Sequence, residues 1–142
     1  AMAEDVLQKC FTAGLLEARS GGVTTHLPLV GAPEGAVRHR MCDAQGWHSY
    51  GSETDFVRGC AGASNDLGGG VTEAMVRFAA QHEYARTVED VLARRCRMLF
   101  LDARKAARVA RGVAEVLQQE TGRDPQLPAF LELTEQYLRL PV

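Results

Sequence analysis

An apolar repeat between residues 103 and 117 constrains the fold of this chain more than any other feature. Ala103, Ala106, Ala110, Val113 and Leu117 follow one another at intervals of three or four residues, which places them on one face of an α-helix. Three of the five are alanines, and small side chains let a second helix approach closely. Gly122 is the usual end signal for such a helix. The sequence therefore predicts a long helix with a buried seam, which we call the alanine seam.

Capping signals predict three more helices in the second half of the chain. Thr72 precedes a helix with Glu73 in its first turn, and Thr87 with Asp90 forms a Thr-x-x-Asp capping box that opens another. A break is expected over Tyr84–Arg86, and a last helix restarts at Asp124–Pro125 or at Pro128. The side chains expected to line these helices on their apolar faces are Met75, Phe78, Ala79, His82, Val88, Val91, Leu92, Cys96, Phe130, Leu133 and Tyr137.

The first 70 residues are less regular. The expected elements are a helix from Met2 to Leu16, an extended segment over 23–30, a loop over 31–35, a weak helix over 38–44 and a helix that starts at Ser52. This last helix should carry Phe56 and Val57 inward, and the three glycines at 68–70 predict a hinge or a tight turn. We therefore expect a mainly α fold. Residues 71–142 form an orthogonal helical bundle, and residues 1–70 form a helix and an irregular, partly extended N-terminal arm.

The composition excludes several classes of protein. The 142 residues hold 16 Lys and Arg against 18 Asp and Glu, a net charge of −2, whereas nucleic-acid binders are usually strongly basic. No apolar run approaches the roughly 18 residues needed to span a bilayer, and the start of the chain does not have the pattern of a signal peptide. The four cysteines form no Cys-x-x-Cys pair, which favours free thiols and a cytoplasmic location.

The motifs of common active sites do not occur in the sequence. It has no GxGxxG fingerprint, no Gly-Lys-Ser/Thr after Gly68–Gly70 and no GxSxG elbow. Cys96 and Ser52 are nucleophile candidates by residue type alone. The dispersed His and Cys residues do not match metal-ligand spacing. We therefore expect no catalytic, cofactor-binding or metal site in this chain.

A basic cluster is the most suggestive feature for binding. Between positions 86 and 111 stand eight basic residues and three acidic ones. Arg104, Arg108 and Arg111 share one helical face, which could bind phosphates, an anionic membrane or an acidic partner. A solvated helix face is the simpler interpretation. In the run Arg94-Arg95-x-Arg97 the three side chains point in different directions, so at least one must face other protein or a buried carboxylate.

The segment from His82 to Arg97 closely resembles the helical C-terminal domain of FAD-dependent, quinone-linked glycerol-3-phosphate dehydrogenases. The family pattern is Glu-x-Ala-x-Thr-x-x-Asp-x-Leu-x-Arg-Arg-x-Arg. Its named positions here are Glu83, Ala85, Thr87, Asp90, Leu92, Arg94, Arg95 and Arg97. Thr25-x-Leu27-Pro28-Leu29-x-Gly31, Tyr50-Gly51 and the segment 133–138 also resemble this family, so the likeness covers nearly the whole chain.

The resemblance implies that the chain is the C-terminal domain of a longer enzyme, which we call the parent enzyme. Such an enzyme oxidises sn-glycerol 3-phosphate to dihydroxyacetone phosphate and passes electrons through FAD to quinone at the inner face of a membrane. Its catalytic and flavin-binding residues belong to a flavin domain outside this chain, which would be the partner of this domain. Asp90, Arg94, Arg95 and Arg97 are then expected to tie the helices together and to dock them on the flavin domain.

Two alternatives belong to other classes. The chain could be a freestanding module that uses the face of Arg104, Arg108 and Arg111 to bind anionic lipid, nucleic acid or an acidic partner. It could also be a structural domain that forms a homodimer through the alanine seam.

Overall fold

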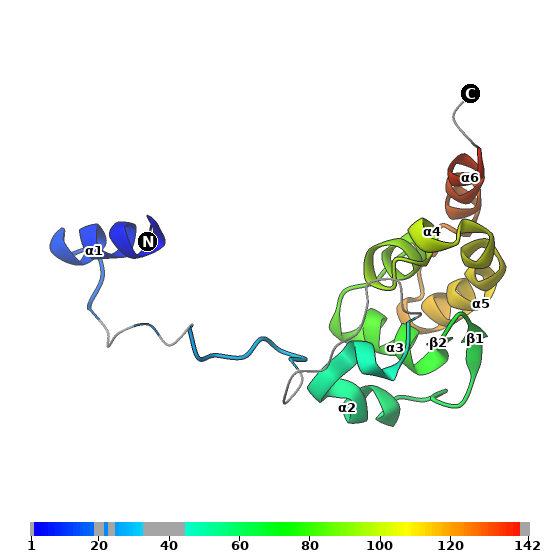
Figure 1. The fold of residues 1–142 in the computed structure, drawn as a ribbon, viewed down its shortest axis with the longest axis horizontal. Coiled ribbons are helices and arrows are strands. Elements are labelled where there is room, and N and C mark those ends of the chain that lie inside the picture. The colour runs from blue at the N-terminus through cyan, green and yellow to red at the C-terminus, as the bar shows by residue number, and fades with distance from the viewer. Residues whose placement is uncertain (1, 19–21, 23–24, 33–44, 140–142) are drawn as a thin grey trace.

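In a computed structural model of the chain, the residues described are 2–18, 22, 25–32 and 45–139. They form a mainly helical fold with one short hairpin, as Figure 1 shows. The elements in chain order are α1 (Met2–Thr12), the 3-10 helix η1 (Trp47–Glu53), α2 (Thr54–Gly59), β1 (Asp66–Gly68), β2 (Val71–Thr72), α3 (Glu73–His82), the π-helix η2 (Asp90–Arg95), α4 (Met98–Leu101), α5 (Ala103–Thr121) and α6 (Leu127–Leu138). The mainly α fold predicted from the sequence is confirmed.

Helix α5 is the centre of the main core, and α3, α4 and α6 all pack against it. The alanine seam is buried there, with Ala106, Ala110, Val113 and Leu117 fully covered. Gly122 ends the helix in a left-handed conformation, and its N–H donates to the carbonyl of Gln118 at 2.9 Å. The predicted helix is therefore confirmed. Its seam packs inside this domain, so a dimer built on these residues would require the domain to open.

A smaller apolar cluster joins η1 and α2 to α3. Val57, Met75 and Phe78 are buried, and the rings of Tyr50 and Phe78 meet edge to face with their centroids 5.6 Å apart. Val57 points inward as predicted, but Phe56 remains 56% exposed, so that part of the prediction was wrong. The short helix turns Val57 toward the core and leaves Phe56, one residue earlier, on the outer side.

Gly69 and Gly70 form the tight turn between β1 and β2, which pair antiparallel, and Gly68 is the last residue of β1. All three have positive φ angles. A Cβ atom at Gly70 would lie 1.8 Å from the carbonyl oxygen of Gln45, so only glycine fits there. The hairpin itself was not expected. The domain boundary at residue 70 stays a prediction, and it falls within this turn.

Helices α3 and α6 follow their sequence signals, except that His82, which was expected on the apolar face of α3, is exposed at the last turn of the helix. The Thr72 hydroxyl accepts a hydrogen bond from the Met75 N–H at 3.4 Å, so Thr72 caps α3 as predicted. On α6, Phe130 is buried and Leu133 half-buried. Tyr137 is half-exposed, so the apolar face of α6 is only partly covered.

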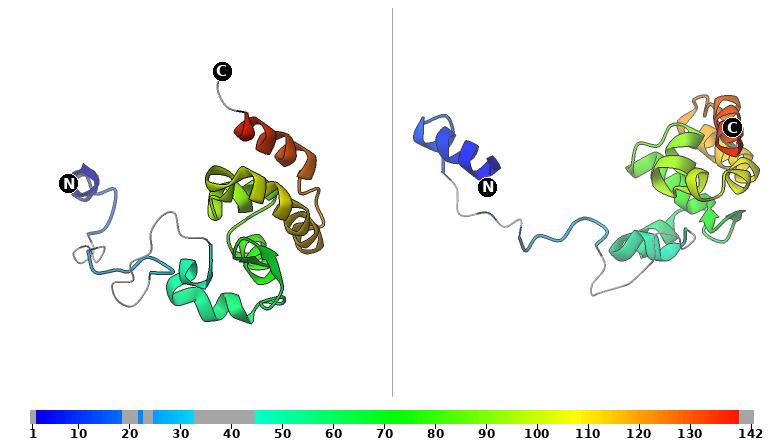
Figure 2. Two further views of the ribbon diagram at one scale, coloured as in Figure 1. Left: turned by 45° about the vertical axis from the view of Figure 1, so that its right-hand side comes forward. Right: turned by 45° about the horizontal axis from the view of Figure 1, so that its top comes forward.

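The described residues before position 45 contribute no side chain to either core. Helix α1 forms as predicted but ends at Thr12 instead of Leu16, because a turn with Gly14 in the left-handed conformation follows it. No residue of α1 is buried, and the helix lies apart from the rest of the described chain in Figures 1 and 2. The described residues 25–32 form no strand, with a turn at Thr25 and His26. The predicted weak helix over 38–44 lies outside the described residues.

No helix in the described ranges is long and apolar enough to cross a membrane.

Candidate functional site

The family motif forms a compact turn and helix start between α3 and α4. Asp90 is its centre, because one carboxylate oxygen accepts the backbone N–H groups of both Arg86 and Thr87 at 2.9 Å. In return, the Asp90 N–H donates to the Thr87 hydroxyl at 3.2 Å. This reciprocal pair is the capping box predicted from the sequence.

The environment of Asp90 favours its charged form. Burial by itself raises the pKa of Asp90. Hydrogen bonds from the backbone of Arg86 and Thr87, from the Thr87 side chain and from Arg94 outweigh burial and lower the pKa to about 2. The carboxylate therefore stays ionised at pH values at which an ordinary aspartate takes up a proton.

Arg95 connects the end of α3 to the motif helix. Its Nε lies 2.9 Å from a carboxylate oxygen of Glu83, and one terminal nitrogen donates to the Asp90 carbonyl at 2.8 Å. The other terminal nitrogen donates to the backbone carbonyl of Glu83. One guanidinium thus holds both ends of the loop 83–90. Arg95 thus faces other parts of the protein, but its carboxylate partner Glu83 is 39% exposed and is not the buried carboxylate that the sequence analysis considered.

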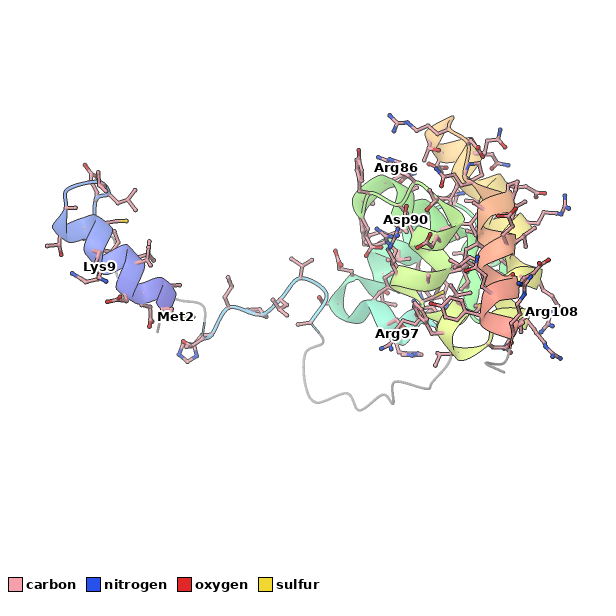
Figure 3. The ribbon with its side chains drawn as sticks, turned by 90° about the horizontal axis from the view of Figure 1, so that it is seen from above. Met2, Lys9, Arg86, Asp90, Arg97 and Arg108 are labelled. Atoms are coloured by element: carbon pink, nitrogen blue, oxygen red, sulfur yellow. The ribbon has the colours of Figure 1, made fainter. Side chains whose placement is uncertain are left out.

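Arg94 and Arg97 occupy different surroundings. Arg94 pairs with Glu89 at 2.8 Å and with Asp90, and its side chain stays 59% exposed. Arg97 has a left-handed backbone with φ 57°, which is uncommon for a residue with a side chain. It is exposed and forms no ion pair with any described residue. In Figure 3 its side chain points away from the domain, whereas Asp90 lies within the fold.

The helix that follows the capping box is a π-helix, whereas the sequence predicted an ordinary helix. The N–H of Cys96 donates to the Val91 carbonyl at 3.1 Å, five residues back. Val91 and Leu92 still point inward as predicted, and Ala85 of the motif is also fully buried. π-Helical turns are rare in proteins, and those that do occur are frequently found at functional sites.

A polar pocket of about 350 Å³ adjoins the motif. Glu83 and Arg95 line it together with Tyr50 and Glu53 from η1. Burial, followed by the nearby charge of Glu83, raises the pKa of Tyr50 well above its ordinary value, so the phenol is neutral. Gly51 has φ 51° and ψ −122° and kinks η1 beside this pocket. Two of the segments that resemble the family, Tyr50-Gly51 and the arginine motif, therefore meet at one place.

The predicted basic face lies on the outer side of α5. Arg104, Arg108 and Arg111 are all exposed, and none forms an ion pair with a described residue. Figure 3 shows Arg108 pointing outward near α6. These three residues lie apart from the motif network, so the two predicted groups do not form one site.

Two contacts between distant residues escaped the sequence analysis. Arg77 on α3 pairs with Glu120 on α5, and Gln81 donates to the same carboxylate at 2.7 Å. Phe100 after the motif meets Tyr137 on α6 edge to face, with centroids 5.6 Å apart. No local spacing signals either contact, because each pair is separated by more than 35 residues.

Two features typical of cofactor sites are a cluster of metal ligands and a glycine loop that follows a strand of a nucleotide-binding sheet. The described residues contain no group of three His, Cys, Asp or Glu side chains that could hold a metal ion. The glycines at 68–70 turn a two-stranded hairpin instead of following a strand of a nucleotide-binding sheet. What the described geometry defines is a small helical domain held together by an arginine–carboxylate network.

Comparison with known proteins identifies the family of this domain. The family model for the C-terminal domain of alpha-glycerophosphate oxidase matches residues 22–127, and the chain belongs to this family. The resemblance inferred from the arginine motif is thus confirmed. No solved structure gives a significant match.

Three curated relatives are glycerol-3-phosphate dehydrogenases. The mitochondrial enzyme SDP6 of Arabidopsis thaliana is 42% identical over 78 residues, which are 51% of this chain and 12% of the relative. The mitochondrial enzyme of Schizosaccharomyces pombe is 45% identical over 53 residues, covering 37% of this chain and 8% of the relative. The probable mitochondrial enzyme of Dictyostelium discoideum is 33% identical over 108 residues, covering 61% of this chain and 16% of the relative. The chain therefore spans only a small part of the length of these relatives.

Proposed function

We propose that this chain is the C-terminal accessory domain of an FAD-dependent, quinone-linked glycerol-3-phosphate dehydrogenase. In the parent enzyme, sn-glycerol 3-phosphate would lose a hydroxyl proton to a base and a hydride to the flavin, which yields dihydroxyacetone phosphate. The observation that supports this most is the family match over residues 22–127, together with relatives that are glycerol-3-phosphate dehydrogenases. The parent enzyme would act at the inner face of a membrane, on its cytoplasmic side.

The proposed role of this domain is packing and assembly, without chemistry of its own. The Asp90 carboxylate accepts hydrogen bonds from Arg86, Thr87 and Arg94. Arg95 donates to Glu83 and to the Asp90 carbonyl, so these charged groups find their partners within the chain, as expected of groups that hold a fold. The polar pocket beside Tyr50 has no nucleophile paired with a base among its lining residues. We assign the catalytic and flavin-binding residues to the flavin domain of the parent enzyme.

Dye reduction driven by glycerol 3-phosphate tests this proposal. The purified 142-residue chain with added FAD should show no turnover above a flavin-only blank. The parent enzyme should reduce the dye. Turnover by the isolated chain, after removal of host enzyme, would mean that the active site lies here. A parent enzyme with flavin but no such turnover would contradict the proposed reaction.

A second candidate function rests on the exposed face of Arg104, Arg108 and Arg111. A freestanding module would use this face to bind an anionic surface or partner, and its affinity would fall steeply with salt. Binding of the isolated chain to vesicles containing anionic lipid, measured at low and high salt, distinguishes this candidate. The accessory-domain proposal expects no salt-sensitive binding by the chain alone.

A further inference from the structure

The outer ends of α4 and α6 form a depression that the described fold leaves open. Its volume is about 290 Å³, and its walls include Phe100, Leu101, Arg104, Tyr137 and Leu138. We call it the α4–α6 groove. The Phe100 and Tyr137 rings meet at its wall, so α4 and α6 hold the groove in shape.

The walls of this groove are unusually apolar for a free surface. Phe100, Leu101 and Tyr137 are each about half exposed, and Leu138 only slightly less. Four large apolar side chains around one depression mark an interaction site more often than a solvated surface. In Figure 1, α4 and the C-terminal end of α6 lie at one end of the domain, far from α1.

Cations without partners border the groove. Arg104 lines it, and Arg108 follows one turn later on the same face of α5. Neither forms an ion pair with a described residue. The Asp102 carboxylate also lines the groove, and it accepts the Lys105 N–H at 2.9 Å as the cap of α5. The groove therefore presents one guanidinium, that of Arg104, without an ion-pair partner among the described residues, beside the capping carboxylate of Asp102.

We propose that the α4–α6 groove docks an apolar surface of the remaining part of the parent polypeptide, and that this surface offers a carboxylate to Arg104. Arginine and aromatic side chains are the residue types enriched at the centres of protein interfaces, and Arg104, Phe100 and Tyr137 stand in the walls of this groove. The relatives extend far beyond this chain, which covers between 8% and 16% of their lengths. Most of such a protein thus lies outside the chain and supplies the occupant. This inference rests on the proposed function.

This proposal assigns different roles to the arginines of the basic cluster. Arg94 and Arg95 use their charges inside the chain, on Glu89, Asp90 and Glu83. Arg104, which has no internal partner, contributes its charge to the interface. Docking is therefore carried by the groove instead of by the Arg94-Arg95 pair.

Hydroxyl-radical labelling of Phe100 and Tyr137 tests the inference. In the parent enzyme, their labelling should fall about threefold relative to the isolated chain, because an interface excludes water from its centre. Unchanged labelling of both rings in the parent enzyme would overturn the inference. So would protection of the isolated chain by phosphatidylglycerol vesicles, which indicates a lipid surface, or protection that appears only as the isolated chain dimerises.

A charge reversal sharpens the same test. Arg104→Glu in the parent enzyme should restore labelling of Phe100 toward the value of the isolated chain. Arg111→Glu is the matched control, since Arg111 is exposed on the same helix face and does not line the groove; it should leave Phe100 protected. Equal labelling in both variants would contradict the role of Arg104.

Enzyme activity distinguishes this inference from the proposed function. An active parent enzyme in which the groove residues are labelled refutes only this inference. An inactive parent enzyme in which the groove residues are protected refutes only the proposed function.

Discussion

At the scale of single residues, the arginines of the family motif differ in what they hold. The Arg95 guanidinium donates to three acceptors on both sides of the loop 83–90, and its side chain is only 27% exposed. Arg94 lies one position earlier with its side chain mostly in solvent. Charge-assisted bonds contribute most when solvent is excluded, and exposed ion pairs contribute little.

Replacing Arg95 by Ala should therefore destabilise the chain by about 2 kcal/mol, because the Glu83 carboxylate and two backbone carbonyls lose their donor. Arg94→Ala is the matched control and should cost less than about 1 kcal/mol. Urea unfolding of both variants measures the difference. Equal costs for the two would mean that the loop is held by the capping box alone.

Asp90 gives a pH-dependent prediction. Its folded pKa of about 2 lies below the ordinary 3.8, so the unfolded chain takes up the proton first as the pH falls. The resulting stabilisation is complete above the ordinary pKa and is lost as the pH falls through the folded pKa. Its size is about 2 kcal/mol.

The measurement is the free energy of unfolding of the native chain and of Asp90→Asn as a function of pH. The gap between them should shrink by about 2 kcal/mol between about pH 5 and pH 2, because the variant has no proton to gain at this position. The many other carboxylates affect both proteins alike and cancel in the difference. A gap that stays constant would show that the carboxylate has no depressed pKa.

At the scale of elements, α5 shows what a sequence pattern can determine. Its apolar repeat, its end at Gly122 and the burial of the alanine seam all follow from spacing that can be counted. The partner of the seam could not be deduced in the same way, because small residues permit close packing within a domain and between two chains alike. The structure assigns it to packing inside the domain.

Enlarging the seam should therefore lower stability. Ala106→Leu should cost about 1–3 kcal/mol, since Ala106 is fully buried and additional methyl groups have no space. Ala107→Leu, one position away and half-buried, should cost less than about 0.5 kcal/mol. Thermal or urea unfolding compares the two. If Ala106→Leu instead changed only the oligomeric state in light scattering, the seam would be an interface between copies.

The π-helix η2 shows where counting residues fails. The capping box at its start was legible in the sequence, and so were its inward residues Val91 and Leu92. The sequence did not reveal the change from hydrogen bonds between residues i and i−4 to bonds between residues i and i−5, because both geometries bury nearly the same side chains. Arg95 donates to the Asp90 carbonyl in this stretch, but its carboxylate partner, Glu83, lies twelve residues earlier in the chain.

At the scale of the whole molecule, α1 stands apart from the folded unit. Its apolar residues Met2, Val6 and Leu7 are exposed, and a helix of 11 residues is marginal in water without tertiary contacts. Residues 1–21 also lie outside the segment that matches the family model. The stability of the isolated chain should thus come from the part that follows residue 45.

Deleting residues 1–18 should leave the midpoint of thermal unfolding within about 2 °C of the intact chain, because no buried side chain is removed. Far-ultraviolet circular dichroism should show a small loss of helix over the same comparison. A fall of the midpoint by more than about 4 °C would mean that α1 packs on the domain in solution.

The sequence by itself determined the helices with strong apolar periodicity, their caps, the turn at the three glycines and the family. Each of these depends on residues that are close in the chain or on a pattern that the family shares. The tertiary structure alone decided that Arg95 reaches Glu83, that Phe100 meets Tyr137 and that α4 and α6 leave an open groove. Those contacts join residues brought together only when α5 buries its seam, and no local propensity encodes which distant side chain will be opposite.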